Sequence, residues 1–175
     1  MAGCAPTSGT ATLTSVGDRG GAIVVGVDGS PGAVSALEFA LAEGWERGRT
    51  VEVVTAWLGT GQHEGRADSD DLAEGRARVH HMQGDVVARC LEARGENVPD
   101  LLRVVVHDYA GRVLVARAET ASMVVVGSGS PSSASHQVLG SVAEYCVRHA
   151  PVPVVIVPAP ARLERRAAAS AAAVG

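Results

Sequence analysis

Five short hydrophobic runs recur along the middle of the chain, each about as long as a β-strand. The first run, residues 22–27, is continuously apolar, which is typical of a strand that helices cover on both faces. Turn-forming residues and longer amphipathic stretches separate the five runs. The pattern therefore predicts the strands of a parallel sheet at residues 22–27, 51–57, 101–107, 123–126 and 154–157.

Four stretches between the runs place apolar residues at steps of three and four, the spacing of a helix face. In the first of them, Ser30 and Pro31 match the N-cap and first position of a helix. The stripe that follows them consists of Val34, Leu37, Leu41 and Trp45. Further helices are predicted over about 68–94 and 110–120, and a last one with a stripe at Val142, Tyr145, Cys146 and His149.

Strands that alternate with helices predict an α/β fold, a doubly wound three-layer sandwich of a five-stranded parallel sheet and four helices. Ligands of such folds bind outside the carboxyl ends of the strands. Pro151, Pro153 and Pro158 flank the last run. Because proline is tolerated mainly on edge strands, residues 154–157 are expected to form an edge of the sheet.

The two ends of the chain lack this pattern. Residues 1–20 mix Gly, Thr, Ser and Ala without periodicity, which favours a disordered tail, and they do not resemble a secretory signal. Residues 159–175 are Ala-rich and offer no apolar face to bury. We therefore expect one domain over residues 21–158, followed by an Ala-rich C-terminal tail.

All fifteen basic residues are arginine, and this excludes several classes of protein. A P-loop requires its lysine, as do Schiff-base enzymes and protein kinases. The net charge is −4, and no basic cluster exceeds that formed by Arg162, Arg165 and Arg166, which argues against a nucleic-acid surface. No apolar run approaches the roughly 18 residues of a membrane span.

Three cysteines, Cys4, Cys90 and Cys146, are scattered without a C-x-x-C pair. Free thiols in a reducing compartment are the expectation for such a set, so a cytoplasmic protein is predicted.

Two strand ends carry residues suited to ligand chemistry. Asp28 directly follows the first run, where a carboxylate can accept hydrogen bonds from ribose hydroxyls or an adenine amine. Capping of the next helix together with Ser30 is an alternative role for the same carboxylate.

The second such end, after the fourth run, is a segment of almost only glycine and hydroxyl residues, 127–141. A loop of this kind at a helix N-terminus can offer N–H groups to an anion. Ser141 with Glu144 also matches a capping box, so capping and phosphate contact both remain open for Ser141.

These segments together resemble the universal stress protein family. The resemblance rests on Val25-Gly26-Val27-Asp28-Gly29-Ser30, on the loop from Gly127 to Gly140-Ser141, and on Ala150-Pro151-Val152-Pro153-Val154-Val155-Ile156-Val157, and it spans about residues 21–158. It implies a sheet of strand order 3-2-1-4-5. It also implies ATP bound through a G-x2-G-x9-G-[S/T] loop in many members, and homodimers formed through the edge strand, here residues 153–157.

The resemblance assigns candidate nucleotide-binding residues one by one. Gly127 matches the first glycine of the loop, and Gly140 with Ser141 matches its closing pair. Asp28 matches the acidic residue that contacts the nucleoside, and Ala56 matches a main-chain position beside the base. At the second glycine this chain has Ser130 instead, with Gly129 one place earlier.

Two functions from different classes follow. The first is a stress-response regulatory protein that binds ATP or a related adenine nucleotide, with Mg²⁺ as a candidate cofactor because the chain lacks lysine. The alternative is a dimeric interaction module that binds no ATP and whose Gly/Ser loop is only structural. The six histidines and the carboxylates form no catalytic constellation in the sequence, and of the histidines only His136 lies near the proposed site. At most, slow ATP hydrolysis is expected.

Overall fold

The computed structural model describes residues 21–58, 69–129 and 139–160, in which five parallel strands and four helices alternate. The sheet has the strand order β3-β2-β1-β4-β5, and every pairing in it is parallel. The strands are β1 (Ile23–Gly26), β2 (Val51–Trp57), β3 (Leu101–His107), β4 (Met123–Gly127) and β5 (Val154–Val157). The helices are α1 (Pro31–Arg47), α2 (Ser69–Arg94), α3 (Ala110–Ala118) and α4 (Ser141–His149). The predicted fold class and strand order are confirmed.

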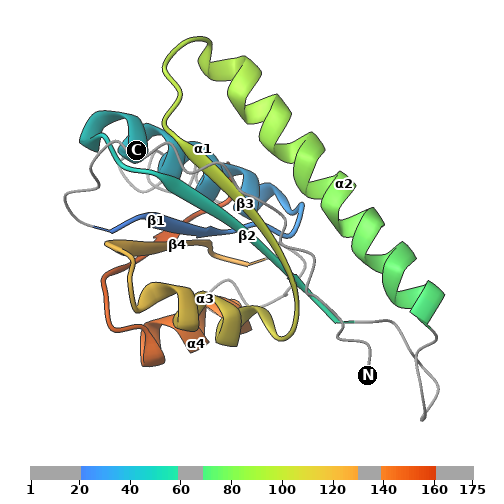
Figure 1. Ribbon diagram of the computed structural model, residues 1–175. Coiled ribbons are helices and arrows are strands. Elements are labelled where there is room, and N and C mark those ends of the chain that lie inside the picture. Colours follow the sequence, from blue (N-terminus) through green and yellow to red (C-terminus); the bar gives the residue numbers. More distant parts are fainter. Residues whose placement is uncertain (1–20, 59–68, 130–138, 161–175) are drawn as a thin grey trace, which may run out of the picture.

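The helices form two layers on opposite faces of the sheet, α1 and α2 on one and α3 and α4 on the other (Figure 1). Each layer has its own core, because successive residues of a strand point to opposite faces. Ile23 and Val25 of β1 pack with α1 and α2, whereas Val24 packs with α3 and α4. The continuous hydrophobic run of β1 is thus explained by burial on both faces.

Helix α1 begins and ends at residues that favour helix boundaries. Ser30 is the N-cap, and its hydroxyl accepts a hydrogen bond from the Ala33 N–H at 3.2 Å, with Pro31 at the first helical position. Gly48 ends the helix in the left-handed conformation, at φ 59°. The start of this helix was predicted correctly from the sequence.

The predicted stripe of α1 is wrong at Trp45, which is 45% exposed. Gly44 takes the core-facing position instead, and a Cβ added there would lie 2.5 Å from Cγ2 of Val51. Because the helix approaches β2 this closely, the face toward the sheet continues through Gly44, and Trp45 is rotated about 100° away from it.

Cys90 and Cys146 are free and buried in the described structure, while Cys4 lies outside the described residues. Burial raises the pKa of the Cys146 thiol to about 11, so this thiol is protonated at neutral pH. Of the helices in the described ranges, none combines the length and the apolar character that crossing a membrane requires. Residues 1–20 and 161–175, predicted as tails, also lie outside the described structure.

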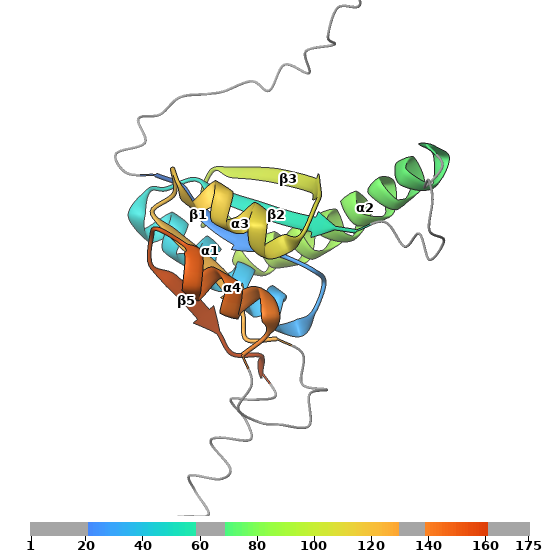
Figure 2. The same ribbon diagram turned by 90° about the horizontal axis from the view of Figure 1, so that it is seen from below.

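The sheet has two edges, β3 and β5, which lie at opposite margins of the molecule (Figure 2). The prediction that residues 154–157 form an edge strand is confirmed. All four residues of β5 are partly exposed.

Candidate functional site

The topological switch point of the sheet lies at its centre, between β1 and β4, where the strand order reverses. β1 and β4 are neighbours, yet β1 leads into α1 on one face of the sheet and β4 leads into α4 on the other. In doubly wound folds, the crevice between two such strands is where ligands bind.

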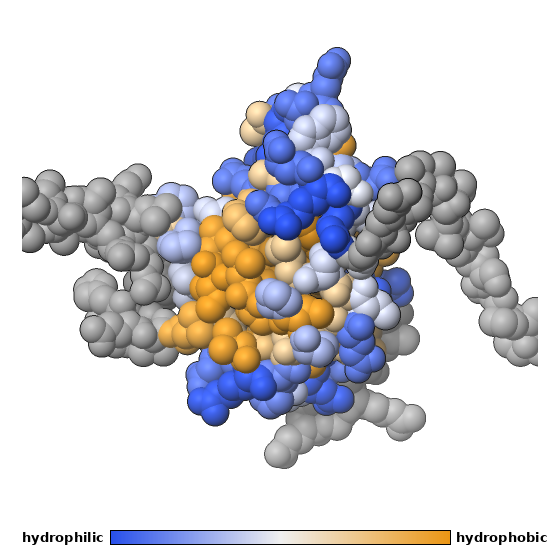
Figure 3. Space-filling view, turned by 90° about the vertical axis from the view of Figure 1, so that its left-hand side faces the viewer, coloured by the Kyte–Doolittle hydropathy of each residue, from blue (hydrophilic) through white to orange (hydrophobic). Residues whose placement is uncertain are grey.

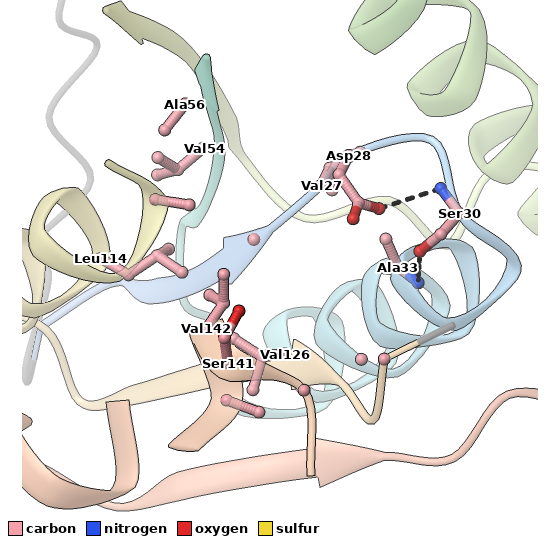
Figure 4. Close-up of a pocket in the computed structure, with 16 residues that line it drawn as sticks. Val27, Asp28, Ser30, Ala33, Val54, Ala56, Leu114, Val126, Ser141 and Val142 are labelled. Atoms are coloured by element: carbon pink, nitrogen blue, oxygen red, sulfur yellow. Dashed lines mark hydrogen bonds between the residues drawn. The ribbon is translucent and has the colours of Figure 1, made fainter. Parts of the chain in front are cut away.

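A pocket of about 260 Å³ lies at this position, outside the carboxyl ends of β1, β2 and β4 (Figure 4). The residues that line it are Gly26, Val27, Asp28, Ser30, Ala33, Val54, Ala56, Ala110, Leu114, Val126, Gly127, Gly129, Gly140, Ser141, Val142 and Ala143. Six of the seven residues predicted from the sequence are therefore brought together around one pocket. The seventh, Ser130, lies outside the described residues, as does His136.

Asp28 uses only one of its carboxylate oxygens within the described structure. Its Oδ1 accepts a hydrogen bond from the Ser30 N–H at 2.9 Å, which closes the turn between β1 and α1. Oδ2 has no hydrogen-bond partner among the described residues, and the side chain is exposed at the pocket. The helix itself is capped by Ser30. The carboxylate thus fixes the turn with one oxygen and keeps the other available to a ligand.

Close packing of main chain shapes the loop that follows β4. A Cβ added at Gly127 would lie 2.6 Å from the carbonyl carbon of Gly32 in α1. Gly129 has φ +93°, a conformation that other residues rarely adopt, and it packs against Gly140, whose Cα lies 3.2 Å from the Cβ position of Gly129. In the part of this loop that is described, positive φ occurs at Gly129.

Ser141 does not cap α4, so of the two roles left open for Ser141 the capping box is wrong. The N-cap is Gly140, whose carbonyl accepts from the Glu144 N–H at 2.9 Å, and no side-chain capping bond is present. The Glu144 carboxylate instead accepts from Arg148 at 2.7 Å. The Ser141 hydroxyl consequently has no hydrogen bond to a described residue and lies at the pocket, beside the N–H groups of the first turn of α4 (Figure 4).

Apolar side chains line the rest of the pocket and form its apolar wall, which was not predicted from the sequence. Val54 of β2, Ala110 and Leu114 of α3, Val126 of β4 and Val142 of α4 form it. One sequence signal could have indicated this lining. Ala110 is a small residue at the first helical position after a strand, so it was expected at the same edge of the sheet as Asp28.

Trp57 does not line the pocket, although its place at the end of β2 allowed that role. Its ring lies 4.7 Å from the His107 ring, centroid to centroid, and packs against α2 at Gly75. His80 and His81 are exposed on α2, and His149 bonds through Nδ1 to the Tyr145 carbonyl at 2.8 Å. Within the described ranges, no group of three or more His, Cys, Asp or Glu side chains is arranged to hold a metal ion.

Fold and pocket together define a doubly wound α/β protein with a candidate ligand site at its switch point. The sequence model of the universal stress protein family matches residues 21–158, and the chain belongs to this family.

Relatives of known name agree with this assignment. The universal stress protein Rv1996 of Mycobacterium tuberculosis is 32% identical over 136 residues, which are 77% of this chain and 43% of that protein. The chain thus spans less than half the length of this curated relative.

Solved structures share the fold. UspA of Lactobacillus plantarum superposes with a TM-score of 0.67 at 21% identity, over 81% of this chain and 99% of the other. A universal stress protein described in complex with cAMP gives a TM-score of 0.61 at 23% identity, again over 81% and 99% of the two chains.

Proposed function

We propose that this protein binds ATP or a related adenine nucleotide in the pocket at the carboxyl ends of β1 and β4. The observation that carries the proposal is the convergence of Asp28, Ala56, Gly127, Gly129, Gly140 and Ser141 on one pocket at the switch point of the sheet. At about 260 Å³, its volume is slightly below the roughly 300–1,000 Å³ that ligand pockets commonly have.

Each part of the pocket suits one part of a nucleotide. The apolar wall around Leu114 offers a surface for a planar base, beside the main chain of Ala56. The open Oδ2 of Asp28 suits ribose hydroxyls, which donate hydrogen bonds to a carboxylate. The first-turn N–H groups of α4 and the Ser141 hydroxyl suit a phosphate, helped by the positive end of the helix dipole.

A related protein supports adenine nucleotides as the ligand class, since a universal stress protein of the same fold is described in complex with cAMP. Membership of the family supports a regulatory role in a stress response, which we propose as the physiological setting.

Titration calorimetry with AMP, cAMP and ATP in the presence of magnesium tests the proposal. Asp28→Ala should weaken binding at least about tenfold, because a hydrogen bond to a charged group contributes roughly 1.5–3 kcal/mol. Gly140→Val should weaken it as well, since its side chain would enter the pocket next to Gly129. Asp100→Ala is the matched control, because Asp100 is an exposed aspartate that does not line the pocket. Absence of any heat at millimolar nucleotide would reject nucleotide binding.

A second proposal concerns the edge strand β5. The alternative function, a dimeric interaction module, is expected to use this strand for pairing. Its four apolar residues are partly exposed, and a hydrophobic area lies on the side of the molecule that carries β5 (Figure 3). An uncovered apolar edge strand is a template for pairing with another chain. We therefore propose a homodimer in which two copies pair through residues 153–157.

Equilibrium sedimentation across micromolar concentrations tests the homodimer. Pro153 and Val157 direct their carbonyls to β4, so the N–H of Val154 points outward. Val154→Pro removes this outward donor and should shift the protein to monomer. A wild-type protein that sediments only as a monomer would contradict the dimer.

A further inference from the structure

Strand β2 continues beyond the end of β1, and this leaves part of its main chain open at the pocket. The pairing of β1 with β2 ends at Gly26 and Val54, and its last main-chain bond runs from the Val27 N–H to the Val54 carbonyl at 2.9 Å. On its other side, β2 stays paired with β3 as far as Trp57 and His107. The last residues of β2 therefore have a strand neighbour on one side only.

Ala56 is the residue whose peptide groups face the open side. The main-chain groups of successive residues in a strand point alternately to the two neighbours, and those of Val54 point to β1. Two residues further on, the N–H and C=O of Ala56 point the same way. If the ladder continued, the Ala56 N–H would donate to the Val27 carbonyl, yet no such bond is present between these described residues.

The Val27 carbonyl accepts from another donor. The hydroxyl of Thr55, which is 2% exposed, donates to it at 2.7 Å. This bond satisfies the carbonyl at the place where β1 leaves the sheet. The Thr55 hydroxyl thus occupies the acceptor that a continued ladder would offer to the Ala56 N–H.

Gln83 of α2 fixes the direction of that hydroxyl bond. The Gln83 side chain is fully buried, and its Nε2 lies 3.1 Å from the Thr55 hydroxyl oxygen and 3.0 Å from the carbonyls of Val53 and Val104. The Arg103 Nε donates to the Gln83 Oε1 at 3.1 Å, so the amide nitrogen must face Thr55. The Thr55 oxygen accepts from Gln83, and its own proton is left for the Val27 carbonyl.

We propose that Thr55 is a positioning residue: by bonding the Val27 carbonyl, its hydroxyl leaves the Ala56 N–H without a partner among the described residues, as part of a main-chain recognition edge for the base of the bound nucleotide. The edge presents one donor and one acceptor side by side, which complements a heterocycle with an adjacent acceptor and amino group, such as adenine. Its role toward a ligand rests on the proposed nucleotide binding. The polar chain from Arg103 through Gln83 to Thr55 links α2 to this edge.

Amide exchange measured by NMR on the ligand-free protein tests the positioning directly. In the wild type, the Ala56 amide should exchange at least about tenfold faster than that of Val54, which lies within the paired ladder. Thr55→Val keeps the shape of the side chain and removes the hydroxyl. The Ala56 amide should then pair with the Val27 carbonyl and exchange about tenfold more slowly, and Thr55→Ser should restore fast exchange. An Ala56 amide already protected in the wild type, or unchanged in Thr55→Val, would overturn the proposal.

Ligand titrations test the recognition role by comparing AMP with ribose 5-phosphate, which lacks the base. Thr55→Val should lower the affinity for AMP about tenfold and the affinity for ribose 5-phosphate less than about twofold. Thr55→Ser should restore the affinity for AMP. Equal weakening of both ligands would assign Thr55 a general structural role and reject recognition. A wild type that binds no AMP would reject the proposed function, while the exchange result would still decide whether Thr55 holds Ala56 open.

Discussion

Individual glycines of the loop after β4 are required by the packing of main chain against main chain. Gly127 lies so close to the first turn of α1 that a Cβ would be 2.6 Å from the carbonyl carbon of Gly32 and 2.9 Å from the Ala33 nitrogen. Gly129 and Gly140 meet in the same way on the other side of the loop. These contacts join only main-chain groups of the fold itself. The glycine spacing therefore serves the packing of the fold, and the proposed phosphate site uses a loop that this packing shapes.

Gly127→Ala should destabilise the protein, whereas Gly32→Ala should not, although the two residues face each other. A Cβ at Gly127 would meet rigid main chain, and such overpacking costs about 1–3 kcal/mol. A Cβ at Gly32 would lie 3.7 Å from its nearest neighbours, which is ordinary contact, and alanine favours the helix by about 0.5–1 kcal/mol. Urea unfolding followed by circular dichroism gives both values. Equal stability of the two variants would contradict the proposed role of Gly127.

The elements of the fold were predictable where local pattern and burial coincide. The runs at 51–57, 101–107 and 154–157 match β2, β3 and β5 to the residue, because each is rich in β-branched residues and is bounded by residues that interrupt a strand. The edge position of β5 followed from its flanking prolines. The start of α1 followed from Ser30 and Pro31, whose side chains fix the local backbone.

Elements were mispredicted where tertiary contacts set their limits. Ser141 and Glu144 fit a capping box in which Ser141 would be the N-cap. In the structure Ser141 is already the first helical residue, and the N-cap is Gly140, which packs against Gly129. The proposed recognition edge at Ala56 depends on how far β2 extends past β1, a stagger between strands that neither strand encodes alone. The convergence of Asp28 with the loop after β4 was predictable, because neighbouring parallel strands end at one edge of the sheet.

At the scale of the whole molecule, the distribution of charge limits how phosphates are held. The chain contains no lysine, and the segment 127–141 contains no arginine. Among the described residues that line the pocket, the only ionisable side chain is that of Asp28, a carboxylate. In the proposed complex, main-chain N–H groups and hydroxyls would face the phosphates where many phosphate sites place a cation, and this arrangement would suit a singly phosphorylated ligand better than a bare triphosphate.

Binding of ATP should accordingly depend on Mg²⁺ more strongly than binding of AMP. Each further phosphate adds negative charge that the pocket does not neutralise, and Mg²⁺ coordinated by phosphate oxygens removes two charges without an all-protein cage. Replacing Mg²⁺ by EDTA should lower the affinity for ATP at least about tenfold and the affinity for AMP less than about twofold. Calorimetry on the same preparation at constant ionic strength measures both. AMP is the internal control, because loss of both ligands in EDTA would point to a metal that the fold itself needs. Equal affinity for ATP with and without Mg²⁺ would mean that cations from outside the described pocket reach the phosphates.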